Sequence, residues 1–153
     1  MRIIFILFFL FFSFNLFCQK VTVKELLSLQ KMDFDRFDSF AIKKGYQFQE
    51  IKSLGVDTFY SYAYDLDISS GRATKFLQYA KPEKGTFITY VILDKTEYSN
   101  LKEEAKKIGF TFSNQENYEG SLIINYTKGN NTLQLITQVG DYGNKYLIRL
   151  RGL

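Results

Sequence analysis

The sequence contains no histidine, no tryptophan and a single cysteine, Cys18, among its 153 residues. Without histidine, neither a Ser-His-Asp triad nor a histidine-containing zinc site can form. Cys18 falls at the end of a predicted signal peptide, so the mature chain would also lack a thiolate nucleophile and disulfide bonds. No Walker loop and no dinucleotide-binding fingerprint is present. We therefore expect no catalytic residue, no metal site and no cofactor.

A short apolar run at the N-terminus predicts export. Arg2 precedes an almost uninterrupted apolar stretch that ends at Phe17, and polar sequence follows. About 15 helical residues span roughly 22 Å, less than the ~30 Å hydrocarbon core of a bilayer, which favours a cleaved signal over a membrane span. We predict a signal peptide over residues 1–18, cleavage between Cys18 and Gln19, and a periplasmic or extracellular protein.

The sequence also allows two other interpretations of the N-terminus. Cys18 could be acylated and retained, which would make the chain a lipoprotein. Such processing normally requires a small residue just before the cysteine and a leucine three positions before it, where this chain has Phe17 and Asn15. The third possibility is an uncleaved anchor. Simple cleavage is the favoured interpretation.

The length and charge of the remaining chain indicate one globular domain. A mature chain over residues 19–153 can bury about two-thirds of its extended surface in a single core. The formal net charge of the sequence is +4, and the charges are spread along the chain, so we expect no nucleic-acid partner. The richness in Lys, Ile, Phe, Asn and Tyr suggests a bacterial source with an AT-rich genome. The oligomeric state is left open.

Two segments of the chain match one another. Residues 33–48 align without gaps with residues 97–112. Each segment has apolar residues at helical spacing, then a glycine, Gly45 or Gly109, then an aromatic-X-aromatic triplet. Glycine adopts a positive φ at a helix C-terminus without steric cost, so each helix is expected to end there.

The rest of each half predicts strands joined by short turns. Turns rich in Gly, Asn, Asp and Ser separate the apolar segments, as is typical of antiparallel hairpins. The predicted strands that follow the aromatic triplets cover residues 59–66, 73–79 and 86–93, and then residues 121–127, 132–139 and 145–151. We predict a single α+β domain of two tandem repeats, about 33–93 and about 97–151. Each repeat is a helix plus four strands, and the antiparallel sheet has its helices packed on one face.

Thr22 and Glu25 form the pattern of a capping box and predict one more helix before the first repeat.

Strand alternation separates two faces of the predicted sheet. Tyr60, Tyr62 and Tyr64 belong to the more apolar face, which we assign to the core, although such a stripe could also be a ligand platform. The opposite face mixes apolar, basic and amide side chains, whereas a solvated face is normally mostly polar. If its apolar residues are contiguous, this face resembles a protein-binding surface; otherwise it is an ordinary surface. The candidate binding residues on it are Lys75, Leu77, Tyr79, Ile123, Gln134, Ile136, Leu147 and Arg149.

Acidic residues leave a catalytic alternative open. The candidates are Asp33, Asp35, Asp38, Glu103, Glu104, Glu116 and Glu119. A suitably spaced carboxylate pair could hydrolyse envelope or extracellular glycans, although acids at a helix start also stabilise the helix dipole. Residues 65–71 faintly resemble a calcium loop but lack its glycine and closing glutamate, so we predict a hairpin tip.

The pattern of residues 26–30, 33–35 and 44–46 resembles a group of small uncharacterised exported bacterial proteins. The duplicated helix-plus-four-strand plan is also similar to the β-lactamase inhibitor proteins, secreted modules that grip an enzyme with the concave face of a sheet. This chain lacks their disulfides, so the likeness is one of architecture. The likeness alone does not assign a function. Our leading hypothesis is an exported, non-catalytic module that binds another protein or an envelope component with its helix-free sheet face.

Overall fold

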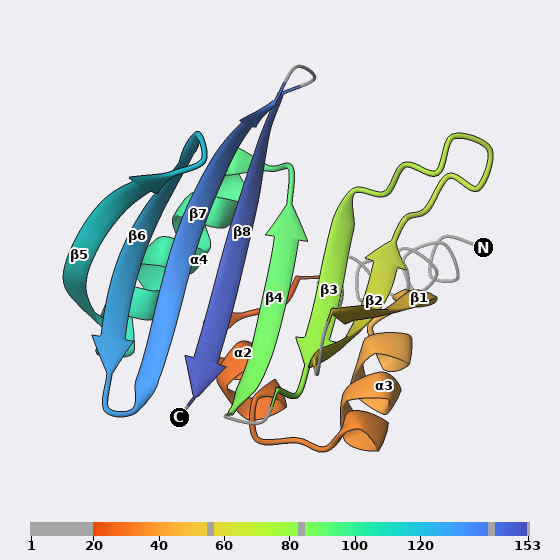
Figure 1. Cartoon of the computed structure of the whole chain (residues 1–153), viewed down its shortest axis with the longest axis horizontal. Coiled ribbons are helices and arrows are strands. Elements are labelled where there is room, and N and C mark those ends of the chain that lie inside the picture. Colours follow the sequence, from red (N-terminus) through yellow and green to blue (C-terminus); the bar gives the residue numbers. More distant parts are fainter. Residues whose placement is uncertain (1–19, 55–56, 83–84, 141–142, 153) are drawn as a thin grey trace, which may run out of the picture.

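The computed structural model describes residues 20–54, 57–82, 85–140 and 143–152. The predicted signal peptide and its cleavage site at Cys18 and Gln19 lie outside these residues. The described part is an α+β structure with three helices and one eight-stranded antiparallel sheet (Figure 1). None of its helices has the length and apolar character needed to span a membrane. The helices are α2 (Val23–Leu29), α3 (Phe34–Lys43) and α4 (Lys95–Lys107). The strands are β1 (Gln47–Leu54), β2 (Asp57–Tyr64), β3 (Lys75–Ala80), β4 (Thr86–Ile92), β5 (Thr111–Tyr118), β6 (Ser121–Lys128), β7 (Asn131–Gly140) and β8 (Gly143–Gly152).

The strands run in the order β1-β2-β3-β4-β8-β7-β6-β5. Each half of the sheet is one helix followed by four strands, and β4 pairs with β8 where the halves meet. The first strand of each half forms an edge of the sheet, and both edge pairs contain a bulge, between Phe48 and Glu50 and between Phe112 and Asn114. The α+β class and antiparallel sheet confirm the predicted fold. That the halves are repeats of one sequence stays a prediction.

The helix boundaries follow from local chemistry. Thr22 accepts the N–H of Glu25 while the Glu25 carboxylate accepts the N–H of Thr22, so the predicted capping box is present at the start of α2. Asp33 caps α3 in the same way by accepting the N–H of Arg36 at 3.0 Å. Gly45 and Gly109 follow the C-caps of α3 and α4 with φ values of +85° and +95°, so each helix ends at a glycine as predicted.

Described contacts between helices and sheet involve one face of the sheet. Phe37 of α3 packs against Tyr62 and Tyr79, with ring centroids 5.5 and 4.9 Å apart. Tyr98 of α4 packs against Tyr146 of β8 at 4.7 Å. Figure 1 shows α2 and α4 behind the sheet as drawn, with its other face open. The tyrosine stripe therefore belongs to the core, and the Tyr62 hydroxyl donates to Asp38 at 2.5 Å.

The prediction that Lys75, Leu77 and Tyr79 lie on the helix-free face is wrong. Leu77 stands opposite Tyr62 and Tyr90 and is fully buried, and the Tyr79 hydroxyl donates to a carbonyl of the segment between α2 and α3. The β3 sequence KFLQYA is apolar in both alternating sets, so its hydrophobic pattern does not decide which set points to the core. The β3 residues on the helix-free face are Phe76, Gln78 and Ala80.

Candidate binding face

Five of the predicted binding residues do lie on the sheet face that the helices leave open, which we call the helix-free face. They are Ile123, Gln134, Ile136, Leu147 and Arg149, and they come from β6, β7 and β8. Residues directly opposite one another on paired strands share a face, and these strands pair Leu147 with Ile136 and Ile136 with Ile123. The sequence thus correctly placed the β6, β7 and β8 candidates on one face.

An apolar row crosses the centre of this face. Pairing continues from Leu147 to Val91 and Phe76, so the row consists of Phe76, Val91, Leu147, Ile136 and Ile123. Its members are half-buried except Ile136, which is 5% exposed. The apolar residues of the face are therefore contiguous, which is the condition under which such a face resembles a contact surface.

A polar row runs beside the apolar row, and its members form three hydrogen-bonded pairs. Its members in strand order are Ser61, Gln78, Thr89, Arg149, Gln134 and Asn125. Gln78 donates to Ser61 at 3.2 Å, and Gln134 donates to Asn125 at 3.0 Å. These bonds hold the amides in fixed positions, so a partner would meet side chains that are already ordered.

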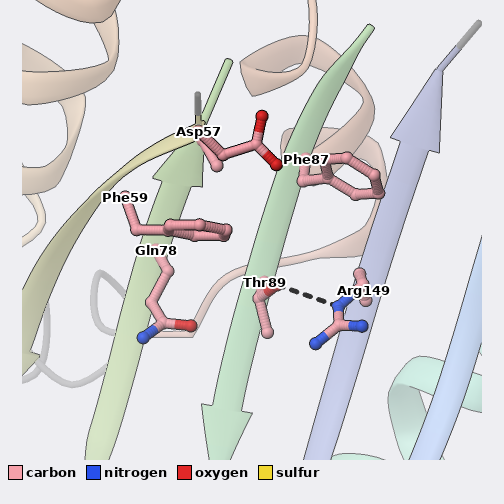
Figure 2. Close-up of a pocket in the computed structure, with 7 residues that line it drawn as sticks. Asp57, Phe59, Gln78, Phe87, Thr89 and Arg149 are labelled. Carbon is pink, nitrogen blue, oxygen red and sulfur yellow. Dashed lines mark hydrogen bonds between the residues drawn. The ribbon is translucent and has the colours of Figure 1, made fainter. Parts of the chain in front are cut away.

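The polar row opens into a cleft of about 230 Å³ (Figure 2). We call it the Arg149 cleft. Its lining residues, from β2, β3, β4 and β8, are Asp57, Phe59, Gln78, Ala80, Phe87, Thr89 and Arg149. Ala80 stands directly between Phe59 and Phe87 in the strand pairing. The hollow exists because a methyl group occupies the position between two large rings.

Arg149 is the cationic group of the cleft. Its Nε donates to the Thr89 hydroxyl at 3.4 Å (Figure 2), and burial lowers the pKa of its guanidinium, although arginine keeps its charge in proteins. Within the described residues, no carboxylate forms an ion pair with Arg149. Arg151, also on β8, lies over the Phe87 ring with 5.1 Å between its Cζ and the ring centroid. The terminal amino groups of the Arg149 fork thus have no anionic partner in this part of the structure.

Among the described residues that line the cleft, Asp57 alone carries a carboxylate. It enters from β2, three strands away from β8, a backbone separation of about 14 Å at the usual strand spacing. The described lining therefore has one charge of each sign, carried by strands on either side of aromatic and amide side chains.

Five of the seven acids proposed for a hydrolase form structural hydrogen bonds or ion pairs. Asp33 caps α3, and Asp38 accepts from Tyr62. Glu104 accepts the backbone N–H groups of Val23 and Lys24 at the start of α2. Glu103 pairs with a lysine one turn along α4, Glu116 accepts from Asn125, Asp35 lies in the first turn of α3, and Glu119 lies in the β5–β6 turn. The described residues contain no cluster of three or more acids that could hold a metal ion.

The turn after β2 is organised by Asp67. Its carboxylate accepts the N–H and hydroxyl of Ser69 and the hydroxyl of Ser70. These hydrogen bonds lower the pKa of Asp67 to about 2. The side chain thus stabilises the hairpin tip predicted for residues 65–71.

Most of the cleft lining was missed by sequence reasoning. Phe59 alternates with Tyr60 and therefore had to point away from the tyrosine stripe, a signal that was present in β2. Gln78 and Ala80 were missed because β3 was assigned to the wrong face. The hollow is formed by residues of β2, β3 and β4, so it can be found only when the pairing of these three strands is known. The residue pattern of one strand does not give that pairing.

Comparisons of this chain with protein-family models, with curated proteins and with solved structures found no match. The resemblance to small exported bacterial proteins and to the β-lactamase inhibitor proteins stays a prediction.

Proposed function

We propose that this chain is an exported, non-catalytic binding module and that its helix-free face contacts another protein or an envelope component. The observation that supports this proposal most strongly is the apolar row from Phe76 to Ile123, which lies on the sheet face opposite the helices and runs beside an ordered polar row. A central apolar strip with polar and basic groups around it is the usual composition of a protein-binding surface.

The two faces of the sheet differ in how their exposed groups are arranged. On the helix side, the exposed apolar residues Phe48, Ile51 and Phe112 lie on the edge strands, and Val139 lies near the end of β7. On the helix-free side, the apolar row, which is half-buried except at Ile136, lies on five adjacent inner strands. A partner can cover the apolar row with one continuous contact, whereas the exposed apolar residues of the helix side are spread over three strands that include both edges.

Affinity capture from the native envelope tests the proposal. The protein, carrying a C-terminal tag, would be expressed in cells that naturally produce it, and the partner recovered with it identified by mass spectrometry. We expect Leu147→Asp and Ile123→Asp to remove that partner, because each places a charge in the apolar row. Ile136 is unsuitable for this purpose, since a buried aspartate there would destabilise the fold.

Ile51→Asp is the matched control, because Ile51 is 57% exposed but lies on the helix side of β1. It makes the same chemical change outside the proposed contact. A partner that Leu147→Asp retains, or that Ile51→Asp loses to the same extent, would rule out the helix-free face as the contact surface.

A further inference from the structure

We propose that the Arg149 cleft receives an acidic side chain, aspartate or glutamate, of the protein that the helix-free face binds. This inference rests on the proposed function and names the chemistry of the partner at one point of the contact. Arg149 lines the cleft with its charge, and no described carboxylate forms an ion pair with it. A planar guanidinium donates two parallel hydrogen bonds to a carboxylate, which makes a carboxylate its best-matched ligand.

The Arg149 side chain is held in position before any ligand arrives. Its Nε donates a hydrogen bond to the Thr89 hydroxyl. Because Thr89 is only 6% exposed, this hydrogen bond is sheltered from water. Fixing Nε orients the guanidinium plane while the terminal amino groups carry the remaining donors. The cost of ordering this side chain is thus partly met by the fold rather than by the partner.

The size of the cleft favours a side chain over a free small molecule. At about 230 Å³ it is smaller than the roughly 300–1,000 Å³ of typical small-molecule sites. A free carboxylate compound would have little surface covered here. An acidic residue of a protein would fill the cleft while neighbouring residues cover the apolar row, as anchor side chains do at the centre of interfaces.

The lining also suits the stem of an acidic side chain. Phe59 and Phe87 flank the hollow over Ala80, so they can contact methylene groups next to the carboxylate. The Gln78 amide and the Thr89 hydroxyl provide polar contacts between the rings and Arg149. Asp57 lies on β2, away from Arg149, where it disfavours a second anionic group.

Nuclear magnetic resonance titration of the ¹⁵N-labelled protein tests this proposal. The probes are two blocked pentapeptides that differ only in a central glutamate or glutamine between two leucines, with glycine at each end. We expect the glutamate peptide to shift the Arg149 Nε–H signal and the amides of Phe87 and Thr89, with affinity about ten-fold or more above that of the glutamine peptide. A third probe, 3-phenylpropionate, represents a free small carboxylate and should bind more weakly than the glutamate peptide.

Variants then separate the contributions of the Arg149 charge, of the guanidinium geometry and of the space over Ala80. Arg149→Gln should abolish the preference for glutamate, Arg149→Lys should weaken it, and Ala80→Leu should weaken it by filling the hollow while leaving Arg149 in place. Asp57→Asn should tighten binding of the glutamate peptide, because it removes a like charge. Lys145→Gln, which removes a positive charge elsewhere on the same face of β8, should leave the preference intact. Unchanged amide spectra would show that each variant is folded.

Three results would overturn the proposal: equal binding of the two peptides, a glutamate preference that survives Arg149→Gln, or no saturable shift with any probe. Tighter binding of 3-phenylpropionate than of the glutamate peptide would instead identify a small-molecule site and would equally contradict it. The capture experiment with Leu147→Asp and Ile123→Asp is independent of these results. The proposed function can therefore hold even if this inference fails.

Discussion

The ammonium of Lys75 on β3 lies 2.9 Å from the carboxylate of Glu97 on α4, so an ion pair joins the sheet to the helix that covers its second half. The two side chains are 15% and 5% exposed. Tyr90 adds a 2.6 Å hydrogen bond to the same carboxylate, and burial, together with the neighbouring Tyr46 and Glu97, raises the pKa of the Tyr90 hydroxyl. This pair is the reason why a lysine from a strand of mixed pattern faces the core.

Lys75→Met is expected to lower the free energy of unfolding by about 3 kcal/mol, because it leaves the Glu97 carboxylate buried without its charge partner. Urea denaturation at pH 7 measures this loss. The matched control is Lys145→Met on the exposed part of β8, which should change stability by less than about 0.5 kcal/mol. The double variant Lys75→Met with Glu97→Gln should be less destabilised than the sum of the two single variants. Equal, small effects of Lys75→Met and Lys145→Met would mean that Lys75 is a surface residue after all.

Glu25 should make the free energy of unfolding depend on pH in the acidic range. Burial alone would raise its pKa, but the Lys44 ammonium at 2.8 Å and the hydrogen bonds from Thr22 outweigh burial and lower the pKa. The charged form is therefore favoured in the folded state. Its contribution is complete above the unfolded pKa of about 4.3 and is lost as pH falls through the lower folded pKa.

Glu25→Gln should consequently cost about 1 kcal/mol at pH 7, and the difference from the unaltered protein should shrink as pH falls below about 4. Urea denaturation at a series of pH values measures both quantities. A cost that stays constant down to pH 2 would contradict the assigned role of the Lys44 pair.

Asp67 should titrate at an unusually low pH. The carboxyl carbon resonance of Asp67 is expected to show a midpoint of about 2, because Ser69 and Ser70 donate hydrogen bonds to the charged form. Stabilisation of the turn is then present above the unfolded pKa of about 3.9 and is lost as pH falls through about 2. The double variant Ser69→Ala with Ser70→Ala should move the midpoint towards about 3.9. A midpoint that the serine variant leaves unchanged would argue against these bonds.

The N-terminus of the mature protein tests the predicted export. Expression in the native cells followed by intact-mass measurement should give a chain that begins at Gln19 and is found outside the cytoplasm. An added lipid mass on Cys18 would assign the chain to the lipoproteins, and an intact Met1 in the cytoplasmic fraction would contradict export.

The helices and strands could be predicted from the sequence. Which face of β3 points to the core could not. Caps such as Thr22 and Asp33, and the glycines Gly45 and Gly109, act locally, so their effect on helix boundaries can be predicted from neighbouring residues alone. The face of β3 depends instead on which of two apolar sets pairs with β2, and that choice is made by tertiary contacts.

The candidate site was only half predictable for a related reason. Leu147 and Arg149 could be assigned to the helix-free face because the alternating set of β8 that contains Tyr146, Ile148 and Leu150 is clearly the more apolar one. The Arg149 cleft depends on Ala80 standing between Phe59 and Phe87, which are brought together only by the pairing of three strands.

Site-specific photo-crosslinking in the native envelope tests whether the helix-free face contacts a partner. A photoreactive phenylalanine analogue would replace Leu147 in one variant and Ile51 in the other, one on each face of the sheet. We expect a discrete crosslinked product from position 147 and none from position 51. A product from position 51 alone, or the same product from both positions, would contradict the proposal.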